Sequence, residues 1–120
     1  MAGPSWETED FCYLTTKGRR SGRPHTIEIW FTASDARLFL MSGGGRRADW
    51  VRNLQADPSV SVRVGSRTFS GTARVVMDRH EDDLARRMLA TKYQGWREGK
   101  PLSRWARTAL PVAIDLQDED

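Results

Sequence analysis

The residues best suited to chemistry lie in a short basic segment, residues 14–24, which reads LTTKGRRSGRP. Guanidinium groups and a hydroxyl are directed donors toward an anion, and glycines let backbone N–H groups approach it closely. The segment therefore predicts an anion cradle, with a solvated basic hairpin tip as the alternative. Its candidate residues are Lys17, Gly18, Arg19, Arg20, Ser21, Gly22 and Arg23.

A second informative segment, residues 41–58, reads MSGGGRRADWVRNLQADP. Ser42 and three glycines, Gly43, Gly44 and Gly45, lead into a predicted helix that carries Trp50 and Asn53. Bare glycine backbone allows a ring system or a phosphate to lie against it, and a helix N-terminus favours an anion. The alternative is a flexible connection followed by a core tryptophan and a capping asparagine. An asparagine within a helix, as at Asn53, favours either a ligand contact or a buried polar bond.

Motifs for the common kinds of catalysis are missing from the sequence. Its two histidines and one cysteine are scattered, so no cluster has the spacing of metal ligands. The sequence contains no GxSxG, GxxxxGK[ST] or GxGxxG motif. His80 is expected on the surface, whereas His25 directly follows the basic loop and is either structural or a contact to the same anion.

The charge distribution favours an anionic partner. Residues 11–114 contain all 19 lysines and arginines but only nine of the 16 carboxylates, so their net charge is +10. A body this basic suits a nucleic acid, a phosphorylated cofactor or a membrane surface.

Length and composition indicate one domain with one modest core. We expect a mobile leader at 1–8, a single domain at 9–117 and an acidic tail at 118–120. No apolar run is long enough to span a membrane, and the leader has no signal-peptide core. The lone Cys12 excludes an internal disulfide and suits a reducing, cytoplasmic setting.

Hydrophobic periodicity and turn residues predict a mainly β protein with short helices. Six antiparallel strands with interposed helices favour a small β-barrel, because closure leaves no exposed sheet edge. The same periodicity places Thr32 on the outward face, Met77 on the face of Phe69, and Leu84 toward the interior. The expected strands are 11–16, 25–33, 37–41, 60–64, 67–77 and 110–116, and the expected helices are 48–55, 78–92 and 102–109.

The order of these segments resembles a known family. TTKGRRSGRP, IEIWF, SGGG, DWVRNLQADPSVSVRVG and WARTALPVAIDL follow one another as in the deazaflavin (F420)-dependent nitroreductase and quinone reductase family. The resemblance covers about residues 14–116. It implies a six-stranded antiparallel split β-barrel of the flavin-binding superfamily that also holds the pyridoxamine phosphate oxidases (PNPOx-like).

The resemblance also implies roles for individual residues. Those matching the family's cofactor contacts are Arg19, Arg20, Ser21, His25, Ser42, Gly43, Gly44, Gly45, Trp50 and Asn53. Those on the implied substrate side are Glu28, Trp30, Tyr93 and Trp96. Glu28 departs from the family, because a proline is common there. The loop from Ser42 to Trp50 is also about two residues shorter than in the best-known relatives.

The function implied is hydride transfer from reduced F420 to an electron-poor acceptor such as a quinone, an enone or a nitroaromatic. No side chain is expected to be catalytic, because the cofactor carries the chemistry and the protein positions it. One alternative is an FMN-binding oxidoreductase on the same barrel, and the many cations favour F420 with its acidic tail. The other is a non-enzymatic module that binds single-stranded nucleic acid or another anion.

The expected partner is a small-molecule hydride acceptor, with no nucleic acid, no metal and no stable membrane insertion. Without the long membrane-associating extension of some relatives, the chain is expected to be compact and soluble. The sequence leaves open whether it forms a homodimer.

Overall fold

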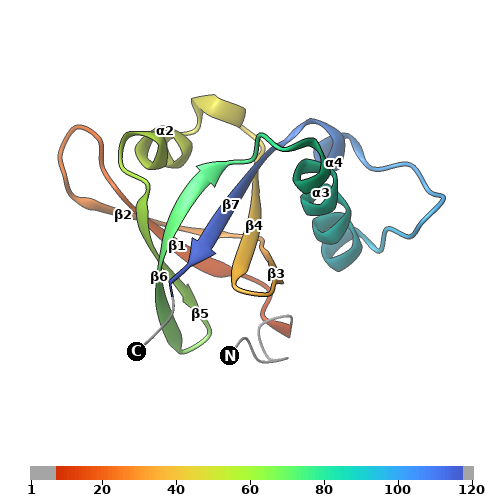
Figure 1. Cartoon of the computed structure of the whole chain (residues 1–120), viewed down its shortest axis with the longest axis horizontal. Helices are drawn as coiled ribbons and strands as arrows, with labels where there is room; N and C mark the ends of the chain where they lie inside the picture. Colours follow the sequence, from red (N-terminus) through yellow and green to blue (C-terminus); the bar gives the residue numbers. More distant parts are fainter. Residues whose placement is uncertain (1–7, 118–120) are drawn as a thin grey trace.

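The computed structural model describes residues 8–117, so nearly all of the expected leader and the whole acidic tail lie outside the described residues. The chain forms a curled antiparallel sheet flanked by helices (Figure 1). The strands are β1 (Cys12–Lys17), β2 (Pro24–Ile29), β3 (Thr32–Ser34), β4 (Arg37–Ser42), β5 (Ser59–Val64), β6 (Arg67–Val75) and β7 (Leu110–Leu116). The helices are η1 (Gly45–Arg47), α2 (Asp49–Ala56), α3 (Arg79–Gln94) and α4 (Arg104–Thr108).

The prediction of six strands is wrong, because the described residues form seven. The expected strand 25–33 breaks at Trp30 and Phe31 into β2 and β3. In the sheet order β2-β1-β5-β6-β7-β4-β3, these two strands lie at opposite edges. The chain must therefore leave one edge and join the other at this point, and regular alternation ends there. Thr32, expected to face outward, is buried in consequence.

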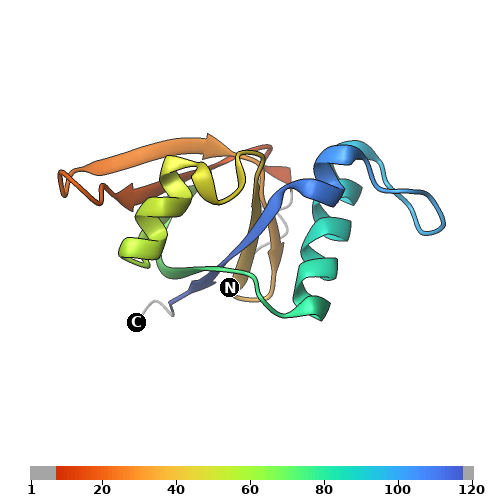
Figure 2. The same cartoon turned by 90° about the horizontal axis from the view of Figure 1, so that it is seen from above.

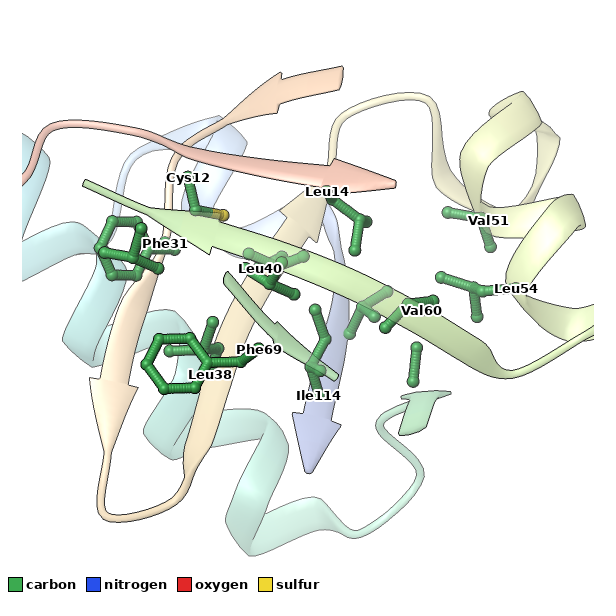
Figure 3. Close-up of a cluster of buried hydrophobic side chains, with 14 residues drawn as sticks. Cys12, Leu14, Phe31, Leu38, Leu40, Val51, Leu54, Val60, Phe69 and Ile114 are labelled. Carbon is green, nitrogen blue, oxygen red and sulfur yellow. The ribbon is translucent and has the colours of Figure 1, made fainter. Parts of the chain in front are cut away.

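Side chains of the curled sheet and of α2 form the main core (Figure 3). Leu14, Leu40 and Ile114 are fully buried inside the curled sheet. Val51 and Leu54 point from α2 toward this core, so the helix covers one opening of the sheet. Burying a side chain of this size stabilises the fold by about 1.5–3 kcal/mol. The burial of Val51 and Leu54 therefore holds α2, together with its N-terminus, against the sheet.

A second core lies between the sheet and α3, on the side away from α2 (Figures 1 and 2). Phe39 and Ala113 of the sheet pack here with Ala85 and Leu89 of α3. The Asp78 side chain caps α3, because it accepts a hydrogen bond from the Glu81 N–H.

Two predicted facings near α3 are wrong. Leu84 is 39% exposed, because α3 turns its Ala85 and Leu89 side toward the sheet. Met77 is 79% exposed, while Val76 is buried, because β6 ends at Val75 before the expected alternation reaches Met77. Both predictions assumed that a local hydrophobic period decides which side chain is buried. Tertiary packing instead decides which side of α3 faces the sheet and where β6 ends.

Candidate functional site

The basic loop between β1 and β2 forms a closed turn. The Gly18 N–H donates to the Arg23 carbonyl and the Gly22 N–H to the Gly18 carbonyl, both at 2.8 Å. Ser21 Oγ accepts from the Arg23 N–H at 3.1 Å. Gly22 has φ +75°, a conformation that favours glycine. The loop is thus a hydrogen-bonded structure with a defined outer surface.

His25, at the start of β2, lies directly against this loop. A Cβ atom built on Gly18 would lie 2.8 Å from the His25 ring and 2.9 Å from Ser21 Oγ. Only glycine allows this approach, so the sequence-based placement of His25 beside the predicted anion site is supported by geometry.

Asn53 of α2 holds the loop in place. Its Oδ1 accepts from the Arg19 backbone N–H at 3.2 Å and from Arg19 Nη1 at 2.8 Å. Its Nδ2 donates to Thr16 Oγ1 at 3.2 Å. Asn53 and Thr16 are both buried, so losing these bonds would leave polar groups unsatisfied. The buried polar bond considered for Asn53 in the sequence is present, and its partner is the basic loop.

Arg19 is therefore engaged within the protein. Besides Asn53, its Nη2 contacts Asp49 Oδ1 at 3.2 Å. By contrast, the side chains of Arg20, Arg23 and His25 make no hydrogen bond or ion pair within residues 8–117. These three side chains can donate hydrogen bonds and are therefore available to a ligand.

A hollow of about 290 Å³ brings Arg20 and His25 together, whereas Arg23 does not line it. We call it the anion cradle. It is lined by Gly18, Arg19, Arg20, Ser21, His25, Asp49 and Asn53. Five of the ten predicted cofactor residues lie here. Sequence reasoning missed Asp49, although it directly precedes Trp50 in the recognised helix motif.

The predicted glycine loop starts in β4 and ends at α2. Ser42 is buried, and its Oγ donates to the Gly45 carbonyl at 3.0 Å, which ties the loop to the strand end. A Cβ built on Gly43 would lie 4.0 Å from the Trp105 ring. Trp50, at the other end, is half-buried and packs against the main core.

A second, larger hollow of about 500 Å³ lies at the Trp105 end of the glycine loop. We call it the aromatic cleft. It is lined by Phe11, Glu28, Ile29, Trp30, Met41, Gln94 and Trp105. Large apolar walls with few polar groups are typical of sites for small organic ligands. Glu28 and Trp30, both predicted on the substrate side, line it.

Three aromatic side chains from distant segments fix one wall of the cleft. The Trp30 and Tyr93 rings stack at 4.3 Å between centroids with a 4° interplanar angle. Trp105 meets Trp30 edge-on at 5.3 Å. The Tyr93 hydroxyl accepts from the Phe31 N–H at 3.0 Å, which locks the stack to the β2–β3 break. Tyr93 thus supports Trp30 from behind.

Glu28 is held at the edge of the cleft by Tyr13. These residues are paired across β1 and β2, and Tyr13 Oη donates to Glu28 Oε2 at 2.8 Å. The hydrogen bond to this carboxylate and its charge raise the pKa of Tyr13. Tyr13 therefore remains a neutral hydrogen-bond donor. Of the two Glu28 carboxylate oxygens, Oε2 accepts its hydrogen bond.

Trp96 is not part of this arrangement. Its Nε1 donates to the Lys100 carbonyl at 2.7 Å in the turn that follows α3, and it does not line the cleft. Trp105 takes that place. In the sequence, Trp105 stands out only as part of the segment WARTALPVAIDL, because its side-chain direction depends on how α4 packs.

Among residues 8–117, no group of three or more His, Cys, Asp or Glu side chains could hold a metal ion. No helix in the same range is long and apolar enough to cross a membrane.

The curled antiparallel sheet with its short flanking helices defines a split β-barrel protein, in which the glycine loop connects a basic hollow with an aromatic cleft. The chain belongs to the F420H(2)-dependent quinone reductase family, whose family model matches residues 1–117. The resemblance seen in the sequence is thereby confirmed.

Named relatives and solved structures agree with this assignment. The chain is 37% identical over 76 residues to an F420H(2)-dependent quinone reductase of Mycobacterium tuberculosis, a match covering 61% of this chain and 50% of that one. The aligned region thus spans about half the length of this relative. An F420-H2 dependent reductase structure has a TM-score of 0.67 and 17% identity, over 88% of this chain and 93% of the other. A FAD-binding protein of Mesorhizobium loti has a TM-score of 0.66 and 18% identity, over 93% and 82%. These two structures show the fold.

Proposed function

We propose that this chain binds F420 and uses its reduced form to transfer a hydride to a small quinone-like acceptor. One observation carries the proposal: the glycine loop joins the two hollows. Gly43 lies beside Trp105 of the aromatic cleft, and the loop then enters α2, whose Asp49 and Asn53 line the anion cradle. A ligand lying along this loop would have its anionic end in the cradle and its ring at the cleft.

The donors present fit the phosphate of such a cofactor. Arg20 offers a charged guanidinium, and His25 offers a ring nitrogen. Ser21 Oγ accepts a hydrogen bond from the Arg23 N–H, so its own hydroxyl proton can be donated to a ligand. The Arg19 side chain is already bound by Asn53. Arg19 therefore holds the loop in position and adds positive charge to the cradle. The acidic tail of F420 would be attracted by the net charge of +10 that residues 11–114 carry.

The acceptor site would be the aromatic cleft. When bound, reduced F420 supplies the hydride, so the protein needs no catalytic acid or nucleophile of its own. Trp30, stacked on Tyr93, presents a fixed flat surface on which an aromatic acceptor stacks. Glu28 lies at the edge and can accept a hydrogen bond from a hydroxyl of the acceptor. Holding the two reactants face to face accelerates transfer through proximity and orientation.

The direct test is titration of the purified protein with F420 and, separately, with FMN, followed by fluorescence. We expect F420 to bind more tightly, and F420H2 to be oxidised when menadione is added. Tight FMN binding with no F420 signal would contradict the proposal and favour the FMN alternative. Salt-dependent binding of an oligonucleotide without either cofactor would favour the nucleic-acid alternative.

The state of assembly is tested by light scattering during size-exclusion chromatography. A solved structure of the same fold, at 20% identity and a TM-score of 0.67, is described as a domain-swapped dimer. The sequence leaves open whether this chain forms a homodimer, and a mass of one protomer in solution would exclude it.

A further inference from the structure

A carboxylate, that of Asp49, lies within the anion cradle. A site that binds a negatively charged ligand would not be expected to contain one. Asp49 lines the hollow together with Arg19, Arg20 and His25. Its Oδ1 is 3.2 Å from Arg19 Nη2, and its side chain is 85% exposed. Any phosphate bound in the cradle would therefore experience the repulsion of this charge.

Two structural roles for Asp49 can be considered, and both are weak. It is the first residue of α2, where a negative charge stabilises the helix dipole, and the N-cap Ala48 provides no side-chain hydrogen bond. It also pairs with Arg19, but an ion pair this exposed contributes little. The buried Asn53 already holds Arg19 through two hydrogen bonds. Asp49 is thus dispensable for the shape of the loop.

The electrostatic effect of Asp49 depends on the charge of the ligand. A phosphate monoester, as in FMN, loses its second proton near pH 6 and is mostly a dianion at pH 7.5. The phosphate of F420 is esterified on both sides and carries one charge. Cations such as Arg20 attract a dianion more strongly, which taken alone would favour the monoester. Repulsion from Asp49 is about twice as large for the dianion and opposes that preference.

We infer that Asp49 is a specificity-determining residue, which shifts the preference of the cradle away from phosphomonoester ligands and toward phosphodiester ligands. Where the diester is taken to be F420, this inference rests on the proposed function. The underlying claim concerns only the charge of the phosphate and this chain's own residues.

The test compares two ligands that differ only in phosphate charge: FMN and its phosphate monomethyl ester. Dissociation constants are measured by flavin fluorescence at pH 7.5 for the wild-type protein and for Asp49→Asn. We expect the substitution to tighten binding of the methyl ester about threefold and binding of FMN about tenfold, because doubling an interaction free energy squares its effect on the constant. F420, as a third ligand, should follow the methyl ester.

The matched control is Asp35→Asn, which makes the same change of charge in the β3–β4 turn. Asp35 has φ +56°, which asparagine also tolerates, and it does not line the cradle. We expect less than a twofold effect on every ligand, because solvent and salt screen a distant exposed charge.

Several results would overturn the inference. Equal tightening of FMN and its methyl ester would show that Asp49 does not read phosphate charge. Weaker binding of both would make it a positioning residue for Arg19. If neither of the two flavins nor F420 binds to either protein, the cradle is not a phosphate site. Failure of F420 alone to bind would contradict the proposed function, while the two FMN ligands would still decide the role of Asp49.

Discussion

Individual residues of the anion cradle divide into those that hold it and those that can bind. Neighbouring arginines of the same loop fall into different groups: Arg19 donates to Asn53, whereas the Arg20 side chain has no protein partner within the described range. Their adjacency in the sequence suggested equal roles. The difference arises because α2 places one amide oxygen within reach of Arg19 only.

Replacing Arg20 with alanine should weaken F420 binding at least tenfold without changing stability. A hydrogen bond to a charged group contributes about 1.5–3 kcal/mol, and Arg20 holds no other part of the fold. F420 fluorescence titration and urea denaturation measure the two effects. Arg97→Ala, an exposed arginine beyond α3, is the control and should change neither. Unchanged affinity of Arg20→Ala would show that the ligand is held elsewhere.

At the scale of elements, the site depends on three junctions between secondary-structure elements. The β1–β2 loop forms the cradle, the β4–α2 connection carries the glycine loop, and the β2–β3 break carries Trp30. Each junction is anchored by a long-range contact: Asn53 to the first, Trp105 beside the second and Tyr93 on the third. Regular elements also supply lining residues, since Glu28 lies in β2 and Asn53 in α2.

The close packing of Gly18 against His25 gives a prediction about the first junction. Gly18→Ala introduces a Cβ 2.8 Å from the histidine ring, so the loop or the ring must move. We expect a loss of stability of about 1–3 kcal/mol, as for other overpacked sites, together with weaker F420 binding. Urea denaturation and F420 titration measure both effects.

The double variant Gly18→Ala/His25→Ala separates the two effects. Removing the ring relieves the overlap, so most of the stability should return while binding stays weak. If stability does not return, the contact with Ser21 or the backbone is the cause instead.

At the scale of the whole molecule, a cluster of four charged side chains joins β4, β6, β7 and α3. Arg74 donates to Glu81 at 2.6 and 2.9 Å and to Asp115 at 2.9 Å. Arg37 donates to the same two carboxylates at 2.6 and 2.7 Å. Hydrogen bonds from Arg74 lower the pKa of Glu81. Partial burial acts in the opposite direction on Asp115, but hydrogen bonds from both arginines prevail and lower its pKa.

These shifts predict how stability depends on pH. A carboxylate with a lowered pKa in the folded state stabilises the protein at pH values above its unfolded pKa, which is about 4. That contribution is lost as the pH falls through the folded pKa, so unfolding free energy should fall steeply in acid. Arg74→Met should cost about 1–2 kcal/mol at pH 7 and make this acid dependence shallower.

Urea denaturation at pH 7, 5, 4 and 3 measures the effect. Arg107→Met, an exposed substitution on α4, is the control and should keep the wild-type pH dependence. The cluster does not account for acid sensitivity if Arg74→Met and the wild-type protein lose stability in parallel.

Much of the fold and part of the site could be predicted from the sequence by itself. Alternation predicted β5 and most of β6, because strand period is a local property of the sequence. The order of the basic loop and the glycine loop was sufficient to indicate the family, since such motifs lie in continuous stretches of chain. Spacing also placed Arg20, Ser21 and His25 together.

Only the tertiary structure decided which distant side chains meet. Trp30, Tyr93 and Trp105 come from three separate segments, and no local pattern distinguishes Trp105 from Trp96 as a wall of the cleft. The break at Trp30 and the position of Asp49 in the anion cradle likewise follow from closure of the sheet and the docking of α2. The physical reason is that burial and long-range hydrogen bonds, rather than local periodicity, determine where a side chain points once the elements pack.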